Sequence, residues 1–322
     1  MNRRSLLAAA AALPFAPMVA RAQSFPTRPV RMVIGFPPGG GSDQVGRPLA
    51  ARMPDVLGQQ IVVENRGGAN GNLALEHTAR SAPDGYTICH VNNSVIAINP
   101  LLYRNLPFNV LEDFEPLGTV TLGGLIITVP ATLPVRDLQD FVAYARTRPG
   151  QLNFGSGGQG SITHLGFELF VRSAGLNIVH VPYRGSAPAL QDMLGGTIQL
   201  MVDGVNVSKA MMDAGRVRAL AFLGPQRHPL MPDLPTAVEQ GFPAVLVGGW
   251  QGFVAPARTP PAVLDRLEAS LKHAVETQEV QTIFNAGGTI GQFQDRRTMA
   301  RLIREELTRW RPIIADLGLT LD

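Results

Sequence analysis

The chain has 322 residues, more than one hydrophobic core usually serves, so two domains are expected. The formal net charge of +3 comes from three arginines within residues 1–22, and the other basic residues are scattered, which excludes an extended nucleic-acid-binding surface. The single cysteine, Cys89, excludes an intramolecular disulfide and a thiolate metal cluster, and the only lysines, Lys209 and Lys272, form no Gly-Lys-Ser/Thr phosphate loop.

The first 22 residues predict a signal peptide. Arg3 and Arg4 precede an apolar run that ends in Ala20-Arg21-Ala22, the A-x-A pattern that a signal peptidase needs. The run is short and two prolines interrupt it, which disfavours a membrane-spanning helix of about 20 residues. We therefore expect cleavage after Ala22 and export of a soluble protein. The paired arginines also fit a twin-arginine (Tat) signal, so Tat and Sec export both stay open.

From Val30 onward, strand and helix patterns alternate, which predicts parallel sheets with helices on both faces. A first unit has expected strands at Val30–Phe36, Gln60–Glu64 and Tyr86–Val91, and helices through Leu49–Leu57 and Leu73–Arg80. A β-rich stretch, Leu117–Val129, then leads away. The second unit has expected strands at 152–154, 178–181, 198–202 and 217–223, and helices at 137–146, 162–173, 188–194 and 207–214.

The last part of the chain has one expected strand, Trp250–Ala255, followed by helical segments over Pro261–Phe284 and Arg297–Leu317 with no further strand. Because these helices need a sheet to pack on, the chain is expected to return to the first unit. The predicted fold class is α/β, with two doubly wound lobes joined by a two-segment hinge. Lobe 1 would comprise residues 23–124 and 249–322, and lobe 2 residues 125–248. A ligand would lie at the carboxyl ends of both sheets.

The first candidate loop, Phe36–Asp43, lies between the first strand and its helix. Three glycines allow a tight turn and let a ligand approach main-chain N–H groups, while the helix N-terminus favours an anion. Ser42 or Asp43 is expected to cap the helix. The alternative is a plain strand-to-helix turn. The candidate ligand-binding residues here are Phe36, Pro38, Gly39, Gly40, Gly41, Ser42 and Asp43.

A matching loop, Gly155–Ser161, lies between a strand and a helix of the second unit. It satisfies G-x-G-x-x-G, the dinucleotide fingerprint, but the next strand ends in Arg184 where an acidic residue should hold the ribose. No serine lies in G-x-S-x-G, which disfavours a serine hydrolase. A nucleotide-dependent enzyme is therefore the weaker alternative. The candidates here are Ser156, Gly157, Gly158, Gly160, Ser161 and His164, the last of which either faces the cleft or is satisfied by its own helix.

Further candidates follow three other strands. Tyr183, Arg184 and Gly185 precede a helix: Tyr183 could wall the ligand, and Arg184 either neutralises it or faces solvent. Asn92 and Ser94 follow the third strand. Asp203 is the acid best placed to meet an amine, or else is a turn residue. The six histidines lack close metal-ligand spacing, so no metal, cofactor or catalytic residue is predicted.

Several segments match one known family in combination and in order. They are PPGGGSD at 37–43, VVENRGGANG at 62–71, PDGYT at 83–87, FGSGGQGS–H–ELF at 154–170 and VPYRG at 181–185. The ALQDMLGG run at 189–196, LPT–E–GFP at 234–243 and W–G–AP–TP at 250–260 also match. On these motifs the mature chain resembles the Bug (TctC-type) solute receptors of tripartite tricarboxylate transport systems.

The resemblance implies a type II periplasmic binding protein that captures a small carboxylate by hinge closure, without catalysis. The ligand would be an organic acid, a di- or tricarboxylate or an amino acid, held by the loops Phe36–Asp43, Ser156–Ser161 and Tyr183–Gly185. The implied partners are the membrane components of a transporter, or alternatively a sensor kinase that reads closure. A monomer located in the periplasm, without cofactor or nucleic acid, is expected.

Overall fold

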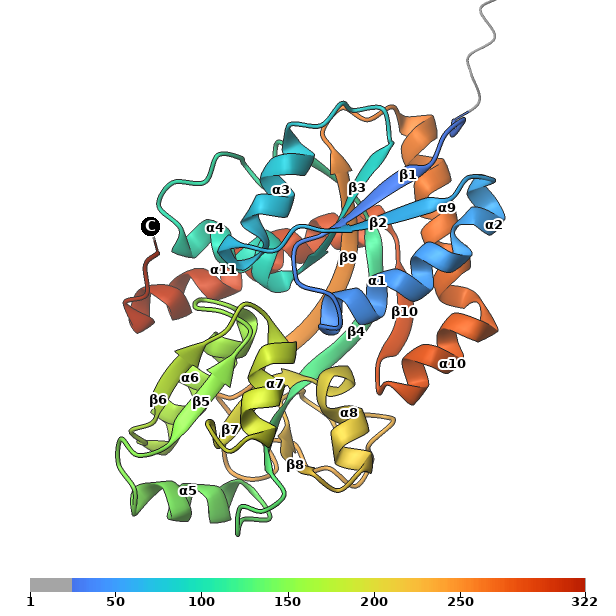
Figure 1. Ribbon diagram of the computed structural model, residues 1–322. Coiled ribbons are helices and arrows are strands. Elements are labelled where there is room, and N and C mark those ends of the chain that lie inside the picture. The colour runs from blue at the N-terminus through green and yellow to red at the C-terminus, as the bar shows by residue number, and fades with distance from the viewer. Residues whose placement is uncertain (1–24, 322) are drawn as a thin grey trace, which may run out of the picture.

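The computed structural model describes residues 25–321, so the predicted signal peptide lies outside the described residues. Figure 1 shows two α/β lobes, one above the other. Lobe one contains the parallel strands β1 (Val30–Ile34), β2 (Ile61–Asn65) and β3 (Thr87–Asn92). Lobe two contains the parallel strands β5 (Asn153–Ser156), β6 (Val179–Pro182) and β7 (Leu200–Gly204).

Two long antiparallel strands join the lobes. β4 (Phe114–Pro130) pairs with β9 (Gly248–Pro256) in lobe one, as far as Gly124 opposite Gly248. From Leu125 onward, β4 pairs instead with β7 and with β8 (Val217–Phe222) of lobe two. The chain therefore crosses into lobe two within β4 and returns at the start of β9.

Helices cover both faces of each sheet. Lobe one carries α1 (Gly41–Arg52), α2 (Pro54–Leu57), α3 (Asn72–Ala79), α4 (Asn99–Leu102), α9 (Pro261–Glu276), α10 (Gln278–Ala286) and α11 (Arg296–Leu317). Lobe two carries α5 (Leu138–Arg146), α6 (Ile162–Ala174), α7 (Ser186–Leu194) and α8 (Val205–Asp213). Local signals set several boundaries: Ser161 caps α6, Asp295 caps α11, and Gly175 and Gly318 end these helices in the left-handed conformation.

Three sequence predictions are wrong in detail. A short strand, β10 (Ile290–Gln294), follows α10 and pairs antiparallel with β4, where no further strand was expected. The single helical segment expected over Pro261–Phe284 is two helices, α9 and α10, because Thr277 between them is extended and its hydroxyl caps α10. The sheets are mixed rather than purely parallel, since β4, β8, β9 and β10 pair antiparallel with their neighbours. Each of these features depends on pairing between strands far apart in the sequence or on a single extended residue, which local periodicity does not encode.

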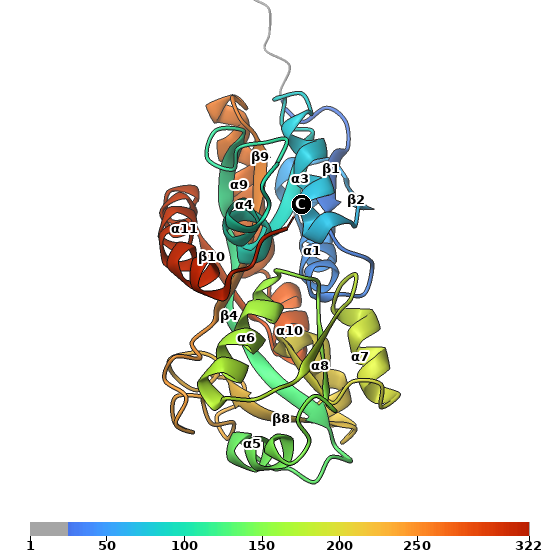
Figure 2. The same cartoon turned by 90° about the vertical axis from the view of Figure 1, so that its left-hand side faces the viewer.

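The C-terminal helix α11 contributes to the cores of both lobes. Met299 and Ile303, near its start, belong to a core cluster of lobe one with strands β1, β3 and β9. Trp310 and Ile314, further along, are buried with the core of lobe two, together with Phe154 and other residues. Figure 2 shows α11 beside β4, above α6. Within residues 25–321, no helix is both long and apolar enough to cross a membrane.

Candidate ligand-binding site

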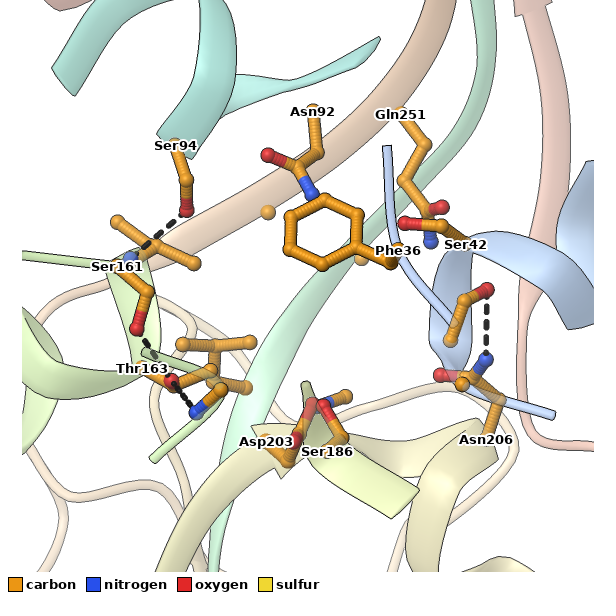
Figure 3. A pocket seen from close by; sticks show the side chains of 18 of the residues that line it. Phe36, Ser42, Asn92, Ser94, Ser161, Thr163, Ser186, Asp203, Asn206 and Gln251 are labelled. Atoms are coloured by element: carbon orange, nitrogen blue, oxygen red, sulfur yellow. Dashed lines mark hydrogen bonds between the residues drawn. The ribbon is translucent and has the colours of Figure 1, made fainter. Parts of the chain in front are cut away.

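A cavity of about 130 Å³ lies between the lobes, at the carboxyl ends of β1, β3, β5 and β7. Lobe one contributes Phe36, Gly40, Gly41, Ser42, Asn92 and Ser94, and lobe two contributes Gly157, Ser161, Thr163, Arg184, Gly185, Ser186, Asp203 and Asn206. Figure 3 shows these polar side chains converging on one space from both lobes. A space of this size suits a small molecule.

The N-termini of α1, α6, α7 and α8 all border this cavity. The lining includes Gly41 and Ser42 of α1, Ile162 and Thr163 of α6, Ser186 of α7, and Val205 and Asn206 of α8. The N–H groups of a first helical turn have no partner within the helix, and the helix dipole makes this end positive. Four helix ends from both lobes therefore bring partial positive charge to one space, which suits an anion.

The first glycine loop holds its shape through Asp43 rather than presenting it to the cavity. α1 begins at Gly41 with Gly40 as its cap residue and without a side-chain cap, so the predicted capping by Ser42 or Asp43 is wrong. The helix starts earlier than expected, and Asp43 within it accepts hydrogen bonds from Gly39 N–H and Arg47 Nε. Burial favours a raised pKa for Asp43, but these hydrogen bonds lower the pKa overall. Pro38 and Gly39 also lie outside the cavity lining.

The second glycine loop, Gly155–Ser161, is in contact with two stacked imidazole rings. His164 and His180 lie 3.8 Å apart between ring centroids, and His164 Nδ1 accepts from Gly160 N–H at 3.0 Å. Ser156 Oγ lies 2.7 Å from His180 Nε2, and burial lowers the pKa of His180 to about 3. His164 is thus satisfied within its own loop and helix, the alternative left open by the sequence. Ser156, Gly158, Gly160 and His164 support the loop and do not line the cavity.

The residues of the third candidate loop, Tyr183–Gly185, line two different cavities. Arg184 and Gly185 line the cavity, and the Arg184 side chain is exposed at its rim. Tyr183 lines a second, adjoining cavity, and its hydroxyl donates to Asp192 at 2.7 Å. Tyr183 therefore does not wall the first cavity. Phe36 and Arg184 border both spaces.

Asp203, the penultimate residue of β7, lines the cavity. Its Oδ1 accepts from the Gly204 N–H at 2.7 Å, while Oδ2 is buried without a partner among the described residues. Burial raises the pKa of Asp203 to about 6, against smaller lowering contributions from Ser186 and the Gly204 amide. The site therefore combines positive helix ends with one buried acidic side chain.

Hydrogen bonds cross the cavity between the lobes. Ser94 Oγ of lobe one accepts from the Ile162 N–H of lobe two at 2.8 Å. Asn206 of lobe two donates to the Gly41 carbonyl at 3.4 Å and to Gln44 Oε1 at 3.1 Å. Figure 3 shows one contact of Ser94 and one contact of Asn206, on opposite sides of the cavity. The structure is thus a closed arrangement in which the lobes touch around the space.

The comparison with known proteins assigns the family. The sequence model described as "Tripartite tricarboxylate transporter family receptor", TctC, matches residues 45–319. The chain belongs to this family. The resemblance inferred from the loop motifs and the predicted two-lobed fold class are both confirmed.

Several TctC relatives cover almost the whole chain. Protein BugT of Bordetella pertussis is 33% identical over 93% of this chain and 92% of its own. The structure of an R. palustris protein with adipate has a TM-score of 0.88 and 32% identity, covering 92% of this chain and 99% of its own. MatC from Rhodopseudomonas palustris with bound malate has a TM-score of 0.85 and 31% identity, covering 90% and 100%.

In this TctC receptor, several cavity residues were missed by sequence analysis. They are Asn70 after β2, Thr121–Leu125 of β4, Asn206, His228, Gly249–Gln251 of β9 and Gly288–Ile290 before and within β10. The β4 and β9 residues could have been predicted from the sequence, because segments that cross between two lobes must run along the cleft. No sequence pattern indicated that Gly288–Ile290 would line the cavity, since β10 was not expected. Within residues 25–321, no group of three or more metal-ligating side chains is found.

Replacing Asp203 by asparagine is expected to stabilise the ligand-free receptor above about pH 6. Because burial raises the pKa of Asp203 from 3.8 to about 6, the folded state binds this proton more tightly than the unfolded chain. Wild-type stability should therefore fall as pH rises from about 4 through 6 and stay lowered above. Two pKa units correspond to about 3 kcal/mol, an upper bound for the gain. Urea unfolding at about pH 4.5 and pH 7.5 measures this difference.

The matched control is Asp213→Asn, since Asp213 lies on α8 of the same lobe, exposed and paired with Lys209. That variant should show no gain at the higher pH. If Asp203→Asn and the wild type share one stability profile across this pH range, Asp203 does not carry the buried charge.

Proposed function

We propose that the chain is a periplasmic solute-binding protein that closes its two lobes around a small carboxylate. The observation that carries the proposal is the convergence of the N-termini of α1, α6, α7 and α8 on one cavity between the lobes. Backbone donors and helix dipoles from both lobes bind an anion best when the lobes are closed. Ligand binding would then stabilise the closed arrangement and join the lobes.

The related structures support a carboxylate. Two proteins of more than 30% identity that cover this chain almost completely were solved with adipate and with malate. Both ligands carry two carboxylates on a short chain. We infer that the ligand of this chain is of the same class, held between Gly40–Ser42 of lobe one and Gly157, Ser161–Thr163 and Arg184–Ser186 of lobe two.

A purely binding role is part of the proposal. The alternative, a hydrolase, needs a nucleophile next to a base. Ser161 Oγ donates to the Gly158 carbonyl at 2.7 Å, and His164 Nδ1 accepts from Gly160, so these two do not form such a pair. Ser156 Oγ and His180 Nε2 do lie 2.7 Å apart, but Ser156 is fully buried and neither residue lines the cavity. We propose delivery to the membrane components of a tripartite tricarboxylate transporter. Closure read by a sensor kinase is the second candidate.

The proposed hinge divides the chain as expected from the sequence, with residues 23–124 and 249–322 in lobe one and 125–248 in lobe two. The passage of β4 between the two sheets and the start of β9 at Gly248 support this division. The proposed location, outside the cytoplasmic membrane in the periplasm, rests on the family and on the predicted export signal.

A thermal-shift screen tests the function. The mature protein is purified, unfolded and refolded to remove any bound molecule, and then heated with C3 to C8 mono-, di- and tricarboxylates and with amino acids. One or a few carboxylates should raise the melting temperature in a concentration-dependent way, since a ligand that binds only the folded state adds RT ln(1 + [L]/Kd). No shift with any carboxylate would contradict the proposal.

A further inference from the structure

Gln251 reaches the cavity from β9 and is held by a buried histidine. In the antiparallel pairing of β3 and β9, Gln251 lies opposite Asn92, and His90 lies opposite Phe253. All four side chains therefore project from the same face of the sheet, and His90 and Gln251 are diagonal neighbours within reach of long side chains. His90 Nε2 lies 2.8 Å from Gln251 Oε1, across 161 residues of sequence. Gln251 and Asn92 line the cavity.

The surroundings of His90 define where its proton sits. The side chain is 2% exposed, and its ring packs edge-on against Phe253. Burial lowers the pKa of His90 to about 4, so the ring is neutral near pH 7. Nδ1 has no partner among the described residues. A proton on Nδ1 would leave a buried N–H without an acceptor, whereas a proton on Nε2 meets the Gln251 carbonyl oxygen. We therefore assign the proton to Nε2.

This assignment fixes the Gln251 amide. With Oε1 accepting from His90, the amide nitrogen faces away from His90 and keeps two N–H donors without a partner among the described residues. Figure 3 shows Gln251 and Ser42 at one end of the cavity, with Ser94 and Ser161 at the other end. The cavity thus has an oriented neutral donor at the lobe-one wall, in addition to the helix N-termini.

We infer that Gln251 determines specificity by donating to a second acceptor group of the bound carboxylate, and that His90 is a positioning residue which orients its amide. The inference rests on the proposed function and narrows its ligand class. A ligand with a second carboxylate fills both features, because one carboxylate meets the N-terminus of α6 at the Ser94 and Ser161 end and the other meets Gln251 beside Ser42. A monocarboxylate with an alkyl tail leaves the Gln251 donors unpaired in a desolvated site, which weakens binding.

The experiment compares acids that differ only in the second carboxylate: succinate with butyrate, and adipate with hexanoate. Isothermal titration calorimetry on the refolded full-length mature protein gives the affinity of each. The wild type should bind at least one diacid more tightly than its matched monoacid. Gln251→Leu should lower that diacid affinity about tenfold or more, the loss expected for a hydrogen bond to a charged group, and leave the monoacid affinity within about twofold.

The role of His90 is tested through the same ratio of diacid to monoacid affinity. A general loss of stability would lower both affinities alike and leave this ratio unchanged. His90→Leu should reduce the ratio, and His90→Gln, which keeps an N–H donor, should restore part of it. Gln278→Leu, at the exposed start of α10, is the control for replacing a glutamine by an apolar side chain and should leave the ratio unchanged.

The outcomes separate this inference from the proposed function. If no carboxylate binds the wild type, the proposed function fails, and the inference fails with it. If carboxylates bind but diacids show no advantage over their monoacids, or if Gln251→Leu keeps the wild-type ratio, the inference is overturned while carboxylate capture stands. If Gln251→Leu removes the ratio and His90→Leu does not reduce it, the positioning role of His90 is overturned.

Discussion

Replacing Gly288 by alanine is expected to weaken binding of the carboxylate found in the thermal-shift screen by about tenfold or more. Gly288 lies in lobe one between α10 and β10, lines the cavity and has φ of +75°. A Cβ added there would lie 2.3 Å from Cγ1 and 3.3 Å from Cβ of Val205, the first residue of α8 in lobe two. Val205 is 3% exposed and β-branched, so it has little freedom to rotate away.

The overlap should act on closure rather than on the fold of either lobe. Gly288 and Val205 belong to different lobes, so separating the lobes relieves the contact. Overpacking of this kind costs about 1–3 kcal/mol, which in this case falls on the closed state alone. A smaller closed population lowers the apparent affinity in proportion. Isothermal titration calorimetry measures the affinity, and small-angle scattering measures the change in overall dimensions.

Gly58→Ala is the matched control for Gly288→Ala. Gly58 ends α2 in the same lobe with φ of +72°, and an added Cβ would meet nothing within 4 Å. Both variants carry the backbone cost of a left-handed alanine, about 1 kcal/mol, but only Gly288→Ala meets the opposite lobe. Equal affinities in the two variants would show that Gly288 and Val205 do not meet in the ligand-bound state.

Replacing Trp310 by alanine is expected to lower the free energy of unfolding by about 3–5 kcal/mol, the usual cost of removing a large buried aromatic side chain. Trp310 is fully buried and belongs to the core cluster of lobe two, although it lies on α11, which starts in the core of lobe one. Its indole N–H donates to Glu306 Oε2 at 2.6 Å. Urea unfolding, followed by far-ultraviolet circular dichroism, measures the loss.

The control for Trp310→Ala is Arg311→Ala, the next residue, whose side chain is exposed. That variant should change the free energy of unfolding by no more than about 0.5 kcal/mol. Because α11 packs on both lobes, Trp310→Ala should also lower the cooperativity between them. A decrease of less than about 1 kcal/mol in the free energy of unfolding of Trp310→Ala would contradict the assignment of Trp310 to the core of lobe two.

Most of the fold could be predicted from the sequence because its units are local. The turn at Gly39–Gly41 and the helix that follows it depend on residues that lie a few positions apart. The glycine loops and the family motifs could be recognised for the same reason. Asp43 shows the limit: its type and position suited a cap or a ligand, but its carboxylate is committed to Gly39, Arg47 and Asn65.

The candidate site was predicted only in part, because many of its residues come from segments that meet only through the fold. Gly40, Gly41, Ser42, Ser161 and Asp203 line the cavity as the sequence suggested. Tyr183 and His164 instead bond within their own lobe, where neighbouring side chains compete for them. No periodicity or motif relates Gln251 to the first loop, and β10, whose start contributes Ile290, is a short strand that pairs with β4 far away in sequence.

By itself, the sequence determined the alternation of strands and helices and the glycine-rich helix starts suited to an anion, and it predicts an export signal at residues 1–22. These depend on composition and on hydrogen bonding between near neighbours. Only the tertiary structure decided that His90 orients Gln251, that Val205 leaves no room beside Gly288, and that Trp310 of the last helix completes the core of lobe two. The physical reason is that these contacts depend on packing between segments far apart in the chain, which no local pattern specifies.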